Sequence, residues 1–184
     1  DTDALASGSG TAAITWISQQ LIATSHRMNP SRSGSAGAYD SGTGTIGGWD
    51  ASEMKTYLTG TIKPLIPSNV RSALKTVTKY SRIYDTTGTA QNNVTSSDDV
   101  WIPSAYEVGF TGYETSGVQY SSAFYDNASR VKSKVGASSA SWWWLRSANN
   151  NNNFRNVNTD GSNNNNNANN SGGVALGSSR SQTK

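Results

Sequence analysis

The alternation of apolar and polar positions is clearest near the C-terminus, in the run WWWLRS at residues 142–147. Successive side chains of a β-strand point to opposite faces of a sheet, so three adjacent Trp side chains cannot share one face. We expect Trp143 and Leu145 to face one way, and Trp142, Trp144 and Arg146 to face the other. This run is the most strand-like in the chain and predicts a β-strand.

The residues that follow predict a second strand, a turn and one last short strand. Residues 154–158 (FRNVN) indicate a strand, and residues 159–162 (TDGS) indicate a turn. Gly161 stands where such a turn needs a positive φ, which glycine adopts without steric cost. Residues 173–176 (GVAL) predict the final short strand.

Helical signals lie in the middle of the chain. Asp50 stands three residues before Glu53, a capping-box arrangement that predicts a helix start. The apolar face of this helix would comprise Met54, Tyr57 and Leu58. Gly60 is expected to end it, since glycine is common just past a helix C-terminus.

Two further helices are predicted after prolines. One begins near Ser68, after Pro67. Its buried stripe would comprise Val70, Leu74 and Val77. A short third helix is expected after Pro103, where Ser104 and Glu107 form another capping box.

The other segments predict little regular structure. Residues 14–23 are ambiguous, because Ile14, Ile17 and Leu21 fit a helix face while Ile14/Trp16 and Leu21/Ala23 fit two strands. Residues 1–11 are expected to be flexible, and residues 29–48 and 84–99 are expected to be loops. Residues 109–140 are expected to form a loop with short elements.

Composition bounds the chain to one domain and excludes several chemistries. It has 184 residues, of which 34% are hydrophobic, and six Trp, eight Tyr and three Phe supply much of its buried area. The absence of Cys excludes disulfides, thiolate nucleophiles and Cys-based zinc sites. The net charge of +3 is scattered, so nucleic acid is not expected as a partner. No apolar run approaches the roughly 20 residues that span a bilayer, so no direct membrane insertion is expected.

The most unusual feature is the density of Asn between residues 149 and 170, where it occupies fourteen positions. Low-complexity disorder or an aggregation-prone tract is one interpretation. The interruption by Phe154 and Val157, the turn at Gly161 and the flanking strands argue against it. An ordered polar surface is a second interpretation, because Asn side chains bond readily to nearby backbone.

The genetic code supports a third interpretation. Asn codons are AAT and AAC, and no substitution at their two adenines creates a stop codon. The outcomes include Tyr, Ser, Gly, Asp, His, Arg and Phe, which resembles the composition of antibody paratopes. Clustered Asn on a rigid frame is therefore what a system that mutates adenines would use as its starting template.

A family resemblance points the same way. The motifs that carry it run from about Ile14 to Leu176: ITW at 14–16, GTIGGWDASEMKTYL at 44–58, LIPSNVRSALKTVTK at 65–79, DDVWIPSAYEV at 98–108, FYDNASRVK at 124–132, WWLRSA at 143–148, FRNVNTDGS at 154–162 and GVALG at 173–177. In this order they resemble the C-type-lectin-fold variable proteins of diversity-generating retroelements, found in bacteria, archaea and their viruses. In those systems a reverse transcriptase copies a template repeat, misreads adenines and replaces the variable repeat.

The resemblance implies an α+β, C-type-lectin-like fold with two main helices and a short twisted antiparallel sheet. The domain is expected over residues 12–177, with its variable region at about 143–177, after a lead-in over residues 1–11 that the residues themselves indicate to be flexible. Relatives tend to finish with an aromatic or Cys-containing strand, and the chain departs from them in residues 178–184 (SSRSQTK), which are expected to form a tail. The implied scaffold residues are Trp49, Trp101, Trp143, Leu145, Arg146 and Gly161. For Arg146, an alternative role in ligand contact is weaker than a structural one, in which it stacks on Trp and bonds carbonyl groups.

The implied ligand-binding, variable residues are the Asn side chains of this segment. They are Asn149, Asn150, Asn151, Asn152, Asn153, Asn156, Asn158, Asn163, Asn164, Asn165, Asn166, Asn167, Asn169 and Asn170. Asn156 and Asn158 flank the turn, so a structural role is an alternative for both. So many unchanged Asn residues indicate a near-template state, in which binding is expected to be weak because aromatic anchors are lacking.

No catalytic residue, metal site or cofactor is expected. His26 has no partners at metal-ligand spacing, and Asp98, Asp99 and Asp160 lack the clustered carboxylates of a calcium loop. The leading hypothesis is a ligand-binding display protein whose partner is a protein or a cell-surface ligand, displayed on a virion or cell surface. A fixed-surface structural or adhesion domain of a virion fibre or cell surface is the alternative, and an enzyme on the same fold ranks last.

Overall fold

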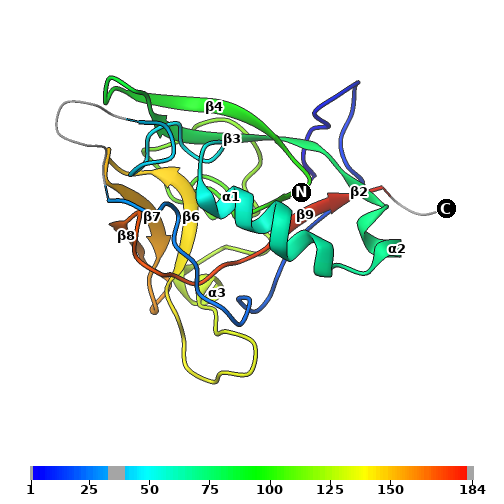
Figure 1. The fold of residues 1–184 in the computed structure, drawn as a ribbon. Coiled ribbons are helices and arrows are strands. Elements are labelled where there is room, and N and C mark those ends of the chain that lie inside the picture. Colours follow the sequence, from blue (N-terminus) through cyan, green and yellow to red (C-terminus); the bar gives the residue numbers. More distant parts are fainter. Residues whose placement is uncertain (1, 33–39, 182–184) are drawn as a thin grey trace.

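The computed structural model of the chain describes residues 2–32 and 40–181. Its described part is an α+β, loop-rich domain in which short helices accompany small antiparallel sheets (Figure 1). Part of the expected loop at 29–48, residues 33–39, lies outside the described residues. Glycine, serine and asparagine are abundant in the chain, and they favour turns over long regular elements.

The first sheet is built around the C-terminal strand β9 (Gly177–Arg180). It pairs antiparallel with β1 (Ile14–Ile17), β2 (Leu74–Lys75) and β5 (Val100–Trp101). The strand interpretation of residues 14–17 is therefore confirmed. The final strand expected at 173–176 is wrong, because the paired residues lie at 177–180.

The expected tail over residues 178–184 differs from the structure in its first part. Ser178 and Ser179 are buried, and the Ser179 hydroxyl lies 2.8 Å from that of Thr15 and donates to Asp3 at 3.1 Å. The polar run SSR shows no hydrophobic alternation, yet it forms a strand because its sheet partners take up its backbone donors and acceptors. Residues 182–184 lie outside the described residues.

The expected flexible lead-in also differs from the structure over residues 2–11. Ala4 forms a β-bridge with Thr11, and Leu5 forms one with Val77. Asp3 is 2% exposed and accepts hydrogen bonds from Lys79 among other groups. This segment is held by the buried charge of Asp3, which local composition does not reveal.

Two long strands form a hairpin across the top of the molecule (Figure 1). They are β3 (Val77–Tyr84) and β4 (Ala90–Asp98), joined in an antiparallel ladder with an irregularity between Ser81 and Ile83. The loop expected at 84–99 is therefore wrong for residues 90–98, whereas residues 85–89 form the turn that connects the two strands. Most of β4 is exposed or half-buried, so polar residues fill it and no apolar alternation marks it as a strand.

The first predicted helix exists with different ends. It begins as α1 (Glu53–Tyr57) and continues as a π-helical turn, η1 (Leu58–Ile62), and a 3₁₀ turn, η2 (Lys63–Leu65). Ser52 caps it by accepting the N–H of Lys55, whereas the predicted cap Asp50 pairs with the Lys55 ammonium. Gly60 lies inside this helical segment, so the predicted C-terminus is wrong.

The second predicted helix is a single turn, α2 (Ser68–Arg71), and the predicted stripe beyond it is wrong because Leu74 and Val77 lie in strands. The capping box of Ser104 and Glu107 forms both reciprocal bonds, but only turns follow it. One further described helix was not predicted. It is α3 (Asn127–Arg130), capped by Asp126 and Ser129.

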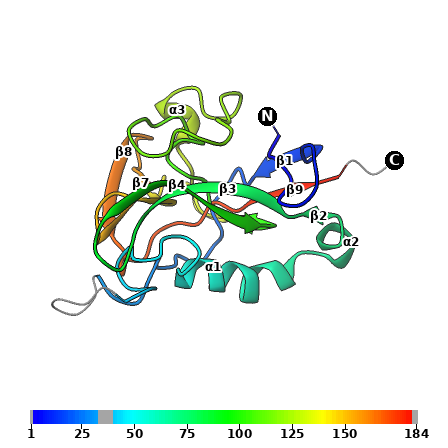
Figure 2. The same cartoon turned by 90° about the horizontal axis from the view of Figure 1, so that it is seen from above.

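The C-terminal sheet stands at the end of the molecule away from β1 and β9 (Figure 2). It comprises β6 (Trp143–Ala148), β7 (Asn153–Val157) and β8 (Asn163–Asn167) in that order. Trp143 and Leu145 pack in one core cluster, while Trp142 and Trp144 pack in the other. The predicted alternation along this strand is confirmed, so β6 separates the two halves of the core.

A charge network is buried between the sheets. Arg146 donates two hydrogen bonds to the Glu107 carboxylate, at 2.6 and 2.7 Å, and its remaining donors bond Ser81, the Ile102 carbonyl and the Tyr80 carbonyl. The same carboxylate accepts from Lys79 at 3.0 Å, and Lys79 also donates to Asp3. Two positive and two negative charges therefore balance, which is the condition for burying them.

Candidate ligand-binding face

The β7–β8 hairpin is held by a turn that requires glycine. Gly161 has φ of 82°, and its N–H donates to the Asn158 carbonyl. Asp160 accepts from both the N–H and the hydroxyl of Ser162. A Cβ on Gly161 would stand 1.8 Å from the Asn127 carbonyl oxygen of α3. The predicted positive φ is confirmed, and the missing side chain also lets α3 pack against the turn.

The Asn residues divide by exposure. Asn163, Asn164, Asn169 and Asn170 are exposed. Those that are half-buried are Asn149, Asn150, Asn151, Asn152, Asn153, Asn158, Asn165, Asn166 and Asn167. Asn156 is fully buried on β7, between the core residues Phe154 and Val157. The outer strand β8 consists of five Asn residues and contributes no apolar side chain to the core.

The side chains of this face bond to one another across the sheet. Asn153 donates from Nδ2 to Asn165 Oδ1 at 2.6 Å. Arg155 donates from Nε to Asn163 Oδ1 and from Nη1 to Asn149 Oδ1, each at 2.9 Å. Arg155 therefore joins β7, β8 and the turn after β6. We name the set of Asn149, Asn153, Arg155, Asn163 and Asn165 the Asn–Arg face.

Other Asn side chains support the local backbone. Asn150 Oδ1 accepts the N–H groups of Asn152 and Asn153, which fixes the turn between β6 and β7. Asn170 donates to Asn166 at 2.9 Å, just beyond the end of β8. These bonds show that the tract is ordered by asparagine's own donors and acceptors.

Replacing Asn156 by Leu, which has nearly the same shape, is expected to raise the stability. Both polar atoms of the buried Asn156 amide lack a hydrogen-bond partner. An unsatisfied buried polar group costs about 1–3 kcal/mol, so its removal should raise the free energy of unfolding by about 1–2 kcal/mol in urea denaturation. The matched control is Asn164→Leu, which lies opposite on the exposed strand and should change it by less than about 0.5 kcal/mol. A large loss for Asn156→Leu would contradict this expectation and indicate a required polar contact.

The predicted scaffold residues are all buried. They are Trp49, Trp101, Trp143, Leu145, Arg146 and Gly161. The Trp143 indole donates to the Arg130 carbonyl at 3.0 Å, and the Lys79 ammonium lies 3.9 Å from the Trp101 ring centre. Arg146 has no exposed surface, and its donors bond to protein groups. The scaffold and the Asn side chains thus occupy different layers of the molecule.

The other candidate residues form ordinary contacts. His26 stacks on Tyr57 with ring centres 3.9 Å apart and lies 3.6 Å from the Glu53 carboxylate. Asp98 pairs with Lys55, and Asp99 pairs with Lys63. Within residues 2–32 and 40–181, no group of three or more His, Cys, Asp or Glu residues is placed to hold a metal ion. None of the helices in those ranges is both long enough and apolar enough to cross a membrane.

A separate cavity of about 360 Å³ lies between β1 and the segment that precedes α3. Lys132 lies at its wall and donates to the carbonyls of Ser18 and Gln19. Burial lowers the pKa of the Lys132 ammonium to about 8. None of the Asn residues predicted to vary lines this cavity, so it is distinct from the Asn–Arg face.

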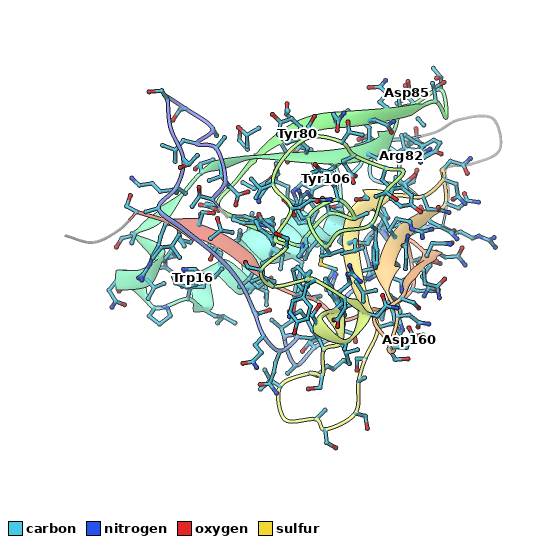
Figure 3. All side chains as sticks on the ribbon, turned by 180° about the vertical axis from the view of Figure 1, so that it is seen from behind. Trp16, Tyr80, Arg82, Asp85, Tyr106 and Asp160 are labelled. Carbon is cyan, nitrogen blue, oxygen red and sulfur yellow. The ribbon has the colours of Figure 1, made fainter. Side chains whose placement is uncertain are left out.

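Sequence reasoning assigned no role to three residues beside the Asn tract. The Arg155 guanidinium lies 4.7 Å from the Tyr113 ring centre, and that of Arg82 lies 5.9 Å from the same ring. Figure 3 shows Arg82 on the side of the β3–β4 hairpin that approaches the C-terminal sheet. The one sign of Arg155 in the sequence is its position within the Asn-rich segment. Arg82 and Tyr113 are remote from this segment in sequence, and only the fold brings them beside it.

These observations define a loop-rich α+β domain that carries an ordered, Asn-covered sheet at one end. The chain belongs to the family described as Domain of unknown function (DUF6273), whose model matches residues 15–175. No curated protein and no solved structure shows a significant match to the chain.

Proposed function

We propose that this chain is a ligand-binding display protein whose Asn-rich surface is diversified by adenine-directed mutagenesis from a retroelement, here in a near-template state. The observation that carries the proposal is that the Asn side chains and the frame residues lie in different layers of the molecule, one at the surface and one buried. Thirteen of the fourteen Asn residues between 149 and 170 are exposed or half-buried, whereas the Trp, Leu and Arg residues of the frame are buried. Side chains can vary on such a surface without a change in the core, since surface substitutions cost little stability.

The proposed fold is C-type-lectin-like. The helical segment over residues 53–65, the single-turn α2 and the small antiparallel sheets are compatible with it. A frame of this kind holds the backbone of the Asn tract before a ligand arrives, which limits the ordering entropy lost on binding. The proposed partner is a protein or another molecule on a cell surface. The chain itself is proposed to be displayed on a virion or on a cell surface.

The proposed mode of action is binding without catalysis or cofactor. The Asn side chains offer amide donors and acceptors that do not titrate near neutral pH. The proposal also involves neither nucleic acid nor insertion into a membrane, in keeping with the scattered basic residues of the chain.

Sequencing the DNA that flanks the gene tests the proposal directly. We expect a reverse transcriptase gene and a template repeat that matches the codons of about residues 143–177. Differences between the two repeats should be few and confined to adenines of the template, because the Asn codons are largely unchanged. Absence of a repeat and a reverse transcriptase from the complete genome would overturn the proposal, as would differences spread over all four bases.

A fixed-surface adhesion domain is the second candidate, and one observation favours it. Asn153 bonds Asn165, and Asn150 bonds two backbone N–H groups, so several Asn side chains have structural roles of their own. A surface selected for these bonds would keep Asn in every natural isolate. Diversification instead predicts that isolates differ at the exposed Asn163, Asn164, Asn169 and Asn170.

A further inference from the structure

Two guanidinium groups share one aromatic ring beside the Asn–Arg face. Arg155 and Arg82 lie on β7 and β3, and both guanidinium carbons lie within 6 Å of the centre of the Tyr113 ring. Arg82 also lies 5.6 Å from the ring centre of Tyr84. The fold therefore gathers two positive charges at one place from segments that are far apart in sequence.

No described carboxylate neutralises this pair. Within residues 2–32 and 40–181, no carboxylate oxygen lies within 4.0 Å of either guanidinium. Glu114 is close, but one of its oxygens accepts the backbone N–H of Arg82 and the other has no hydrogen-bond partner. Even with Glu114 counted, the cluster keeps one excess positive charge. Asp85 and Asp160 are engaged within their own turns.

The two cations also disfavour each other. Burial lowers the pKa of the Arg155 guanidinium, and the charge of Arg82 lowers it further. Arg155 is only 8% exposed, so water screens its charge poorly. An anion that docked at this place would relieve the repulsion of the pair.

The donors of the pair are held in position and are not exhausted. Each guanidinium has five N–H donors. Arg155 is fixed by bonds from Nε to Asn163 and from Nη1 to Asn149, which leaves its Nη2 without a described hydrogen bond. Arg82 donates from Nη2 to the Tyr84 hydroxyl at 3.2 Å, which leaves its Nη1 without a described hydrogen bond. Its Nε also has no partner, but that atom is buried and out of a ligand's reach. A planar acceptor fits such forked donors better than a single-atom anion does.

We infer that Arg82 and Arg155 bind a carboxylate of the partner at the edge of the Asn–Arg face. This carboxylate belongs to an Asp or Glu side chain in an acidic protein segment. This inference rests on the proposed function, whose ligand it describes by chemistry. The Asn side chains then supply neutral hydrogen bonds that vary, while the arginine pair supplies a constant charge beside them. Neither arginine is among the Asn positions proposed to vary, so both charges are kept in every variant, and the pair is held as described where Asn149 and Asn163 are unchanged.

A titration with a hexaglutamate peptide tests the inference, with binding followed by NMR of the ¹⁵N-labelled chain. We expect saturable shifts of the Arg82 and Arg155 side-chain Nε–H signals and of the Asn149 and Asn163 amides, absent with hexaglutamine. The affinity should fall about tenfold in Arg82→Gln, the loss expected for a charge-assisted hydrogen bond. It should also fall as salt rises.

The matched control is Arg71→Gln, because Arg71 is a cation on α2 whose side chain bonds only the Pro64 carbonyl among its described contacts. This control should bind hexaglutamate as the parent does. Arg155 also ties β7 to β8, so Arg155→Lys is compared only after its thermal unfolding matches that of the parent. It should weaken binding because lysine lacks the planar fork.

Two results would overturn the inference. Equal losses in Arg82→Gln and Arg71→Gln would show attraction to net charge alone, and inorganic phosphate that binds as tightly as hexaglutamate would show a phosphate site instead. Failure here is distinguishable from failure of the proposed function. If a template repeat is found but hexaglutamate does not bind, only the carboxylate site is overturned. If hexaglutamate binds but the genome holds no retroelement, only the proposed diversification is overturned.

Discussion

Replacing Arg146 by Met is expected to lower the free energy of unfolding by about 3–5 kcal/mol, the usual cost of removing one partner of a buried ion pair. Arg146 makes both hydrogen bonds of a bidentate pair with Glu107, and both side chains are almost fully buried. Without Arg146 the carboxylate keeps Lys79 as its only cationic partner, and Lys79 is shared with Asp3. Urea denaturation followed by Trp fluorescence measures the loss.

The control and the partner variant separate charge from packing. Arg71→Met removes an arginine on α2 that lies outside the buried network, and it should change stability by less than about 0.5 kcal/mol. The joint change Arg146→Met with Glu107→Leu should cost less than the sum of the single changes, because no unpaired charge is left at this pair. A loss below about 1 kcal/mol for Arg146→Met would contradict the structural role assigned to the network.

The same network predicts how stability depends on pH. Burial acts to raise the pKa of Glu107, but the charges of Arg146 and Lys79 outweigh it and lower the pKa to about 2, from 4.5. A carboxyl whose pKa is depressed on folding stabilises the protein fully above pH 4.5, and this stabilisation is lost as the pH falls toward 2. The urea midpoint of the parent should drop across that window, and Glu107→Gln should flatten this part of the profile.

Gly161→Ala is expected to have the second large effect, lowering the free energy of unfolding by more than about 3 kcal/mol. Two costs combine. A side chain at φ of 82° costs about 1–2 kcal/mol, and the new Cβ would lie 1.8 Å from the Asn127 carbonyl oxygen, which is backbone. The turn and α3 must therefore move apart, which disturbs the end of the β7–β8 hairpin. Urea denaturation measures this loss as well.

Two other glycines serve as matched controls. Gly112 has φ of 91°, and no atom lies within 4 Å of the position that a Cβ would take, so Gly112→Ala should show the conformational cost alone, about 1–2 kcal/mol. Gly60 lies in the helical segment with open space, and Gly60→Ala should be neutral or stabilising by up to about 1 kcal/mol. Equal losses of unfolding free energy at Gly161 and Gly112 would contradict this expectation. They would show that the backbone of Asn127 moves away from the new Cβ without a cost in stability.

Two of the three strands of the C-terminal sheet, β6 and β7, could be predicted because their signals are local, whereas the all-Asn strand β8 was not predicted. The Trp run alternates between two core clusters, and Gly161 occupies a turn position that only a positive φ satisfies. The helix start near Glu53 was also readable, although Ser52 caps it instead of Asp50. Periodicity and capping act over a few residues, so they can be read without knowledge of the fold.

Strands that lack apolar alternation escaped prediction. The polar β4 and the serine-rich β9 are strands because partners distant in sequence take up their hydrogen bonds. The same holds for residues 2–11, which are ordered by the buried charge of Asp3. Backbone donors and acceptors are alike in nearly every residue, so a strand formed by pairing alone leaves no mark in its own sequence.

The sequence by itself determined where the Asn residues cluster, that aromatic residues frame them, and that thiol chemistry is absent. Only the tertiary structure decided that Asn156 is buried, that Lys79, Glu107 and Arg146 form one network, and that Arg82 and Arg155 meet at Tyr113. The physical reason is that burial and charge pairing depend on distances between segments that are remote along the chain. Composition and local periodicity carry no information about those distances.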